Sequence, residues 1–166
     1  MQIEKRIEEL GLILPETAKV PFGIVLDFAW VRVFGDRVYV SGHGPQAPDG
    51  SVVGPFGKVG DEVSPEQAAD AARLATLSVL GSLRRAIGDL DRIAAWLRVE
   101  GYVLAAPGFD RTTNVVNGAS RLIVELFGED RGRHARTAMG VAATPLNCPV
   151  VIAAELALKP QIRVLS

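Results

Sequence analysis

The sequence has little that would mark a secreted or membrane-spanning protein. Its 166 residues include one cysteine, Cys148, so no disulfide can form within the chain, and a lone thiol fits a reducing compartment. No apolar run reaches the roughly 18 residues that a membrane span needs. The opening residues, MQIEKRIEELG, are charged and amphipathic, unlike a signal peptide. These absences predict a soluble, cytoplasmic protein without a membrane partner.

An excess of charge of one sign is also missing. The chain has 18 Lys and Arg residues, 19 Asp and Glu residues and a net charge of −1. Proteins that bind nucleic acids carry a basic patch or stripe, for which this composition gives no sign. The two histidines and the cysteine lack the spacing of a metal-ligand set. We therefore expect no nucleic-acid partner and no metal.

The remaining composition, 48% hydrophobic and 22% charged, suits one domain that spans residues 1–166. The domain is predicted to begin with a short helical arm, because Ile3, Ile7 and Leu10 recur at helical spacing. An extended, proline-containing connection completes residues 1–20.

Two β-rich runs, residues 23–33 and 36–41, surround a Gly35-Asp36 turn and predict a β-hairpin. The glycine- and proline-rich stretch that follows, residues 42–60, is predicted to be a loop. Loops of this length in compact domains are often functional.

Two amphipathic helices follow in the sequence. Ser64 and Gln67 form the pattern of a capping box at the start of the first helix, which Gly88 ends. The second helix begins after a turn at residues 107–110 and is expected to stop at Gly128.

Between the helices, residues 93–105 alternate like a strand, with Trp96 and Tyr102 on the same side. The runs 137–143 and 150–158, joined by a proline-containing turn, predict a second hairpin. The result is an α+β domain with a mostly antiparallel sheet and two helices on one face. The bare face would expose the two aromatic residues, so we expect a homo-oligomer.

Arg136 stands at the entrance of the run 137–143, after a charged stretch, residues 129–133, that we expect to be a solvated loop. A guanidinium offers parallel N–H donors that match a carboxylate, which makes this residue the leading candidate for a ligand anchor. The alternative is an ordinary strand-end arginine paired with a surface carboxylate.

Several short motifs together resemble the RidA/YjgF family of reactive-intermediate deaminases, some of which are labelled endoribonucleases. They are Ser41-Gly42-His43-Gly44-Pro45, Gln67-Ala68, Gly88-Asp89-Leu90-Asp91, Asn117, and Ala135-Arg136-Thr137 followed by Pro145. The resemblance covers about residues 20–158 and is to the branch with an extra N-terminal helix. It implies a chorismate-mutase-like fold and a homotrimer with ligand clefts between subunits. It also implies cofactor-free hydrolysis of small enamine and imine acids to keto acids and ammonia.

The resemblance assigns the substrate carboxylate to Arg136. It places the backbone of Gly42, the ring of Phe28 and the side chain of Asn117 around the ligand. Phe28 stands where the family usually has a tyrosine, and the alternative is that it belongs to the core. Asn117 could equally be a polar residue on the surface of a helix.

One departure from the family pattern bears on catalysis. The family's water-positioning glutamate corresponds to Val151, which would line the cleft without a carboxylate. His43 or His134 could donate a proton or orient water instead, although a loop histidine is more often plain polar surface. Cys148 inherits no role from the family.

Two functions therefore remain open. One is a hydrolase of small imine or enamine acids that uses Arg136 and His43. The other is a non-catalytic trimer that binds a small carboxylate as a sensor or partner module, which Val151 favours. A ribonuclease activity finds little support, because the balanced charge offers no RNA footprint.

Overall fold

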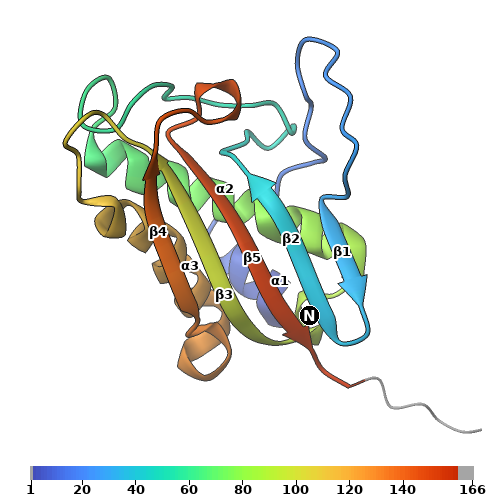
Figure 1. The fold of residues 1–166 in the computed structure, drawn as a ribbon. Coiled ribbons are helices and arrows are strands. Elements are labelled where there is room, and N and C mark those ends of the chain that lie inside the picture. The colour runs from blue at the N-terminus through green and yellow to red at the C-terminus, as the bar shows by residue number, and fades with distance from the viewer. Residues whose placement is uncertain (1, 161–166) are drawn as a thin grey trace, which may run out of the picture.

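The computed structural model describes residues 2–160 as three helices, two short 3-10 turns and five strands in one sheet (Figure 1). In chain order the elements are α1 (Gln2–Glu9), β1 (Val31–Phe34), β2 (Arg37–His43), α2 (Pro65–Ile87), η1 (Leu90–Arg92), β3 (Ile93–Leu104), α3 (Thr112–Gly132), β4 (Ala135–Val141), η2 (Pro145–Asn147) and β5 (Val150–Leu158). The strand order across the sheet is β1-β2-β5-β3-β4.

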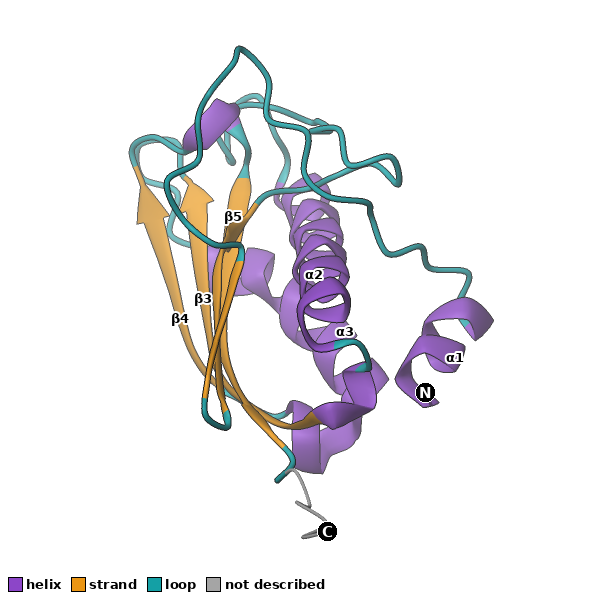
Figure 2. Cartoon of the chain, turned by 90° about the vertical axis from the view of Figure 1, so that its right-hand side faces the viewer, coloured by secondary structure: helices purple, strands orange, loops and turns teal. Residues whose placement is uncertain are grey.

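The helices lie on one side of the sheet, with α2 and α3 against it and α1 farther out (Figure 2). This arrangement matches the predicted α+β domain with helices on one face of a mostly antiparallel sheet. The side chains between the layers form the core, and α1 joins it through the buried Ile3 and Ile7. None of the helices in residues 2–160 is long and apolar enough to cross a bilayer.

The first hairpin is confirmed, but its first strand is shorter than expected. β1 and β2 pair antiparallel from Val31↔Val40 to Phe34↔Arg37, and Gly35 takes the left-handed φ of +63° in the turn between them. Residues 23–30, predicted to extend this strand, are irregular instead. They form a loop that contributes one wall of a pocket described below.

Both ends of α2 follow the sequence prediction. The Ser64 hydroxyl accepts from the Gln67 N–H, the Gln67 side chain accepts from the Ser64 N–H, and Gly88 caps the far end. A small-residue contact then brings α3 close, because Gly118 leaves room for the backbone of Ala69. A methyl group there would lie 2.0 Å from the Ala69 carbonyl oxygen.

The second predicted hairpin is wrong. β4 and β5 are not neighbours, because β3 lies between them. β3, α3 and β4 form a crossover unit, so β4 returns parallel to β3, while β5 inserts antiparallel between β3 and β2. Apolar runs separated by a proline-rich turn fit either arrangement, and only long-range pairing distinguishes them.

The prediction that Trp96 lies on the bare face is also wrong. The register shifts between Trp96 and Arg98, and this bulge turns the indole into the core, where it lies 5.6 Å from the Phe127 ring. Tyr102 does lie on the bare face, where its hydroxyl donates to Glu100. This face is therefore more polar at β3 than the alternation predicted.

The charged stretch after Gly128 is helical rather than a solvated loop. Gly128 interrupts α3 with a φ of +76°, and residues 129–132 then add a further turn. Arg131 from that turn donates to the Ile93 carbonyl oxygen through Nη2, at 2.6 Å, and through Nε, at 3.0 Å. This turn leads the chain into β4 and thereby sets the position of Arg136.

Candidate functional site

The predicted site residues fall into two separate places within one chain. Arg136 and Asn117 line a groove of about 300 Å³ between α3 and β4, here called the arginine groove. Its other lining residues are Ser120, Val124, Glu129, Arg133 and His134. Phe28, Gly42, His43 and Val151 line a cavity of about 320 Å³ at the end of β2 and the start of β5.

The arginine groove is organised around the Arg136 guanidinium at the start of β4. Nη1 donates to Asn117 Oδ1 at 2.8 Å and to Ser120 Oγ at 3.0 Å, and Nη2 donates to the Thr113 carbonyl oxygen at 3.3 Å. Partial burial lowers the pKa of this guanidinium from its ordinary value, although arginine stays charged at neutral pH. Three neutral acceptors of α3 therefore hold a cation in a fixed orientation.

Within residues 2–160, Arg136 forms no ion pair with a carboxylate, and its Nε–H has no acceptor. In the described part of the chain, Arg136 is therefore not the strand-end arginine paired with a surface carboxylate that was the alternative prediction. The Nε–H and one N–H of Nη2 therefore have no acceptor among residues 2–160. The arrangement can bind a carboxylate with charge-assisted hydrogen bonds.

Sequence analysis missed Ser120 and Thr113. Both precede β4 on the same helix as Asn117, and Ser120 follows Asn117 by three residues, so that their side chains share one helix face. That spacing was the available signal. It could have been used once Asn117 had been chosen as a site residue.

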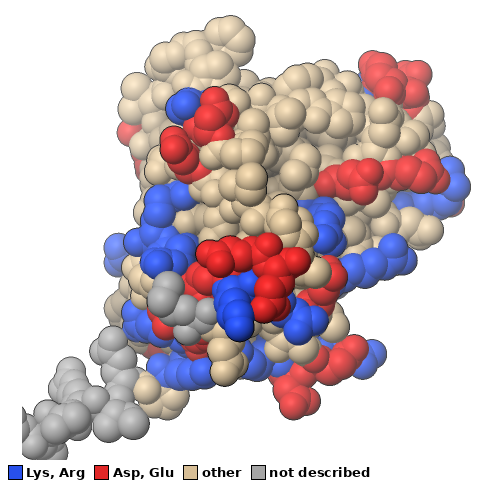
Figure 3. Space-filling view, turned by 180° about the vertical axis from the view of Figure 1, so that it is seen from behind, with Lys and Arg blue, Asp and Glu red and all other residues tan. Residues whose placement is uncertain are grey.

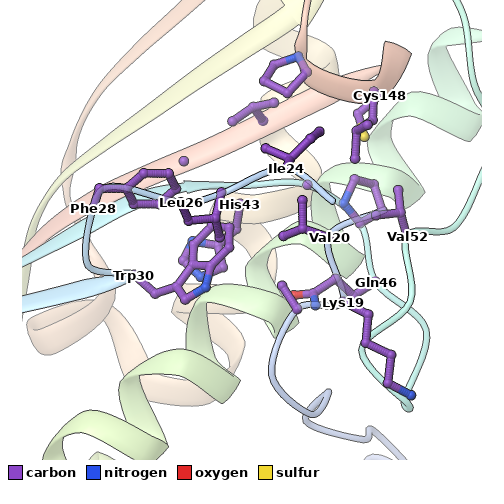
Figure 4. A pocket seen from close by; sticks show the side chains of 17 residues that line it. Lys19, Val20, Ile24, Leu26, Phe28, Trp30, His43, Gln46, Val52 and Cys148 are labelled. Atoms are coloured by element: carbon purple, nitrogen blue, oxygen red, sulfur yellow. The ribbon is translucent and has the colours of Figure 1, made fainter. Parts of the chain in front are cut away.

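The second place, here called the apolar pocket, is lined mainly by aliphatic and aromatic side chains (Figure 4). Among its lining residues are Leu26, Phe28, Trp30, His43, Cys148 and Val151. The Phe28 ring meets the Trp30 ring edge-on at 5.1 Å, and the Trp30 ring lies 4.7 Å from the His43 ring. Phe28 is 51% exposed, so it forms part of the pocket's wall and not part of the core.

Gly42 and Val151 meet at the sheet side of this pocket. A Cβ at position 42 would lie 2.8 Å from Val151 Cγ1, so the valine occupies the space beside the glycine backbone. An apolar group thus stands where the family pattern has a carboxylate. It offers nothing that could orient or deprotonate a water molecule.

His43 is 2% exposed and both of its ring nitrogens are engaged. Nδ1 lies 2.6 Å from the Ser41 carbonyl oxygen, and Nε2 lies 2.8 Å from Ser82 Oγ. Burial and, to a smaller extent, the charge of Arg85 lower the pKa of His43 to about 4, against an opposing effect of the hydrogen bond to Ser41, so the ring is neutral at pH 7. A proton-donating role for His43 remains a prediction, and these contacts favour a structural role.

A possible metal-ligand group lies elsewhere. Glu4, Asp89 and Asp91 bring three carboxylates together in the described part of the chain. Glu4 is already paired with Arg84 at 3.2 Å and accepts from the Leu90 N–H at 2.9 Å. Acidic groups of this kind are common without an ion, and this one ties α1 to η1.

Comparison with known proteins agrees with this fold. Residues 4–156 match the family model "YjgF/chorismate mutase-like, putative endoribonuclease". Protein TCP17 of Trypanosoma cruzi is 33% identical over 157 residues, which are 95% of this chain and 94% of that protein.

Two solved structures are similar along almost the whole chain. Protein Atu1372 of Agrobacterium tumefaciens is 35% identical with a TM-score of 0.82, covering 95% of this chain and 92% of that one. A "putative endoribonuclease" of Shewanella oneidensis is 29% identical with a TM-score of 0.86, covering 95% of this chain and 100% of that one. The chain therefore belongs to the YjgF/chorismate mutase-like family.

Proposed function

We propose that this protein hydrolyses small imine and enamine acids to keto acids and ammonia without a cofactor, and that Arg136 binds the substrate carboxylate. The observation that carries the proposal is the Arg136 guanidinium, which Asn117, Ser120 and Thr113 hold in place while no carboxylate of residues 2–160 pairs with it. A fixed cation with unused donors suits an anionic ligand.

The reaction needs no redox group. In a 2-imino acid, a water oxygen bonds to C2 while the C=N bond becomes a C–N single bond, and one water proton passes to the nitrogen. The remaining hydroxyl proton then passes to the nitrogen as the C–N bond breaks, so that ammonia leaves and the C2=O bond of the keto acid forms. An enamine acid first takes a proton at its terminal carbon and loses one from its nitrogen to become the imine. Arg136 would hold the carboxylate and offset its negative charge beside the reacting carbon.

We propose that a neighbouring copy completes the cleft, as the family resemblance implies for a homotrimer. The arginine groove lies beside β4, an edge strand of the sheet, and the apolar pocket lies at the end of β2 and the start of β5. Neither place alone combines a carboxylate anchor with an apolar wall. In this proposal a second copy docks at the β4 edge with Phe28 and Val151 of its apolar pocket turned toward Arg136 of the first.

A polyanion is a poorer candidate for the ligand. On the side of the helices, Lys and Arg side chains are interspersed with Asp and Glu side chains, without a broad field of one sign (Figure 3). Phosphate-backbone recognition rests on a concentrated basic surface. A single half-buried arginine suits one carboxylate better.

A second candidate function is binding of a small carboxylate without turnover. Val151 against Gly42 favours it, because no carboxylate stands at that position to activate water. General-base assistance is worth about 10²–10⁴ in rate. The engaged nitrogens of His43 point the same way.

The test is release of ammonia and keto acid from freshly generated 2-aminoacrylate and from longer imino acids. We expect the native protein to accelerate release, and Arg136→Ala to lower kcat/KM roughly 10- to 100-fold through loss of a charge-assisted bond. Arg73→Ala is the matched control, because Arg73 pairs with Glu125 at 3.3 Å outside the groove. No acceleration by the native protein, together with Arg136-dependent binding of pyruvate, would establish the second candidate instead.

A further inference from the structure

A chain of hydrogen bonds extends from Arg136 through Ser120 to His134. Arg136 Nη1 donates to Ser120 Oγ at 3.0 Å, and Ser120 Oγ lies 2.9 Å from His134 Nε2. His134 Nδ1 lies 2.7 Å from the Gly132 carbonyl oxygen. The chain thus connects the proposed anchor to a titratable ring in the same groove.

The chemistry of the partners determines where the protons are. A carbonyl oxygen can only accept, so Nδ1 of His134 carries the hydrogen that it donates to Gly132. In a neutral imidazole the other nitrogen, Nε2, is then an acceptor. The Ser120 hydroxyl therefore donates its one proton to Nε2 and presents lone pairs to Arg136.

We infer that His134 is a positioning residue for the carboxylate anchor, whose neutral ring holds the Ser120 hydroxyl as an acceptor toward Arg136. This inference rests on the proposed role of Arg136. Without the ring, the hydroxyl is free to rotate and to offer its proton elsewhere. The Arg136 side chain would then keep Asn117 and Thr113 as acceptors but lose a directed third one.

Protonation of His134 reverses the direction of its bond to Ser120. Nε2 becomes a donor, the Ser120 oxygen receives donors from both sides, and the serine proton loses its acceptor. The groove also gains a further positive charge close to Arg136. Acid should therefore weaken carboxylate binding by loosening the anchor, even though the ligand stays ionised.

The charged groups around the ring come from both elements that form the groove. Arg136 belongs to β4, and Glu129 lies at the end of α3, with Arg133 directly after that helix. Glu129 accepts from Arg133 at 3.1 Å, so these two charges are paired with each other. Burial lowers the pKa of His134 below its ordinary 6.5, and the charge of Arg136 adds to this effect. The ring is thus neutral at pH 7.

The same arrangement occurs once more in the described residues and serves as an internal reference. Arg85 Nη2 donates to Ser82 Oγ at 3.0 Å, Ser82 Oγ lies 2.8 Å from His43 Nε2, and His43 Nδ1 lies 2.6 Å from the Ser41 carbonyl oxygen. There the arginine also donates to the Pro15 carbonyl oxygen at 2.7 Å. His43 should therefore show the same tautomer as His134.

The binding test uses pyruvate as the probe, measured by calorimetry at about pH 7.5 and about pH 5.5. We expect Ser120→Ala and His134→Ala to weaken pyruvate binding roughly 3- to 10-fold at the higher pH, the value of one hydrogen bond. His134→Gln should restore binding, because its amide oxygen can accept from Ser120. The native protein should bind more weakly at the lower pH, and His134→Gln should not.

Ser78→Ala is the control, since this helical serine donates to the Leu74 carbonyl oxygen of its own helix. If His134→Ala binds pyruvate as tightly as the native protein does, and its binding depends on pH in the same way, the inference is overturned.

A second measurement separates this inference from the proposed function. Nitrogen NMR reports the tautomer of His134 and the Nε–H signal of Arg136 without any ligand. We expect the Nδ1–H tautomer and a change of the Arg136 signal in Ser120→Ala. If both are seen while the native protein neither binds pyruvate nor hydrolyses imino acids, the proposed function fails, whereas the placement of the Arg136 side chain through Ser120 and His134 stands. An Nε2–H tautomer at His134 would overturn the positioning role itself.

Discussion

Acidification should destabilise the protein through His43. This ring is 2% exposed, and burial lowers its pKa from 6.5 to about 4. The unfolded chain therefore takes up the proton at a higher pH than the folded one. The stability that the neutral ring contributes is complete above about pH 6.5 and is lost as the pH falls toward 4.

The size of this effect follows from the two pKa values. At about 1.36 kcal/mol for each pH unit between 6.5 and about 4, full protonation costs about 3 kcal/mol of folding free energy. Between about pH 7 and about pH 4.5 the expected loss is about 2 kcal/mol. This is a large part of the 5–15 kcal/mol that stabilises a typical domain.

The assay is urea unfolding at both pH values and at one fixed protein concentration, for the native protein and for His43→Gln. The variant cannot titrate at this position, so the acid sensitivity of all other groups is common to both proteins. We expect the stability advantage of the native protein over the variant to shrink by about 2 kcal/mol at the lower pH. An advantage that stays the same at both pH values would refute the assignment of a buried, neutral His43.

Three further predictions concern packing and thiol reactivity. Gly42→Ala should lower the free energy of unfolding in urea by about 1–3 kcal/mol, because the added Cβ would lie 2.8 Å from Val151 Cγ1. A second substitution, Val151→Ala, should recover most of this stability, and no recovery would contradict the contact. Gly118→Ala should lower the free energy of unfolding by about 3 kcal/mol or more, since the added Cβ would lie 2.0 Å from the Ala69 carbonyl oxygen. An unchanged melting temperature would refute this prediction. Cys148 is 3% exposed, and burial raises the pKa of its thiol. Alkylation of Cys148 at neutral pH should therefore be roughly tenfold slower in the folded protein than in urea. Equal rates would contradict the burial of this thiol.

Local patterns predicted the elements whose ends depend on neighbouring residues. The capping box at Ser64 and the Gly35 turn are set within a few positions of the chain, and both are found in the structure. The partners of β4 and β5 depend on contacts between distant segments. For these strands the proline-containing turn at residues 145–149 was misleading, because it passes β3 instead of closing a hairpin.

Strand alternation failed at Trp96 for a related reason. A bulge adds one residue to one strand, so every side chain before it changes face, and no residue type in the sequence marks the place. The shortened β1 has a different origin. Residues 23–30 are rich enough in apolar side chains for a strand, but several of these line the apolar pocket.

The candidate site was predicted in part. Arg136 and Asn117 lie together in the arginine groove, and the Nη1–Oδ1 bond of 2.8 Å joins them, while their role in ligand binding stays a prediction. The sequence could not indicate that Ser120 and His134 extend this contact, since their meeting depends on how α3 ends and where β4 begins. Nor could it indicate that both nitrogens of His43 are engaged.

The most direct test of the central claim changes the substrate and the protein together. Hydrolysis of an imino acid is compared with hydrolysis of a matched imine in which the carboxylate is replaced by a neutral amide, for the native protein and for Arg136→Ala. We predict that Arg136→Ala lowers kcat/KM roughly 10- to 100-fold for the acid and leaves the amide nearly unaffected. An equal loss for both substrates, or no loss for the acid, would contradict the assignment of Arg136 as the carboxylate anchor.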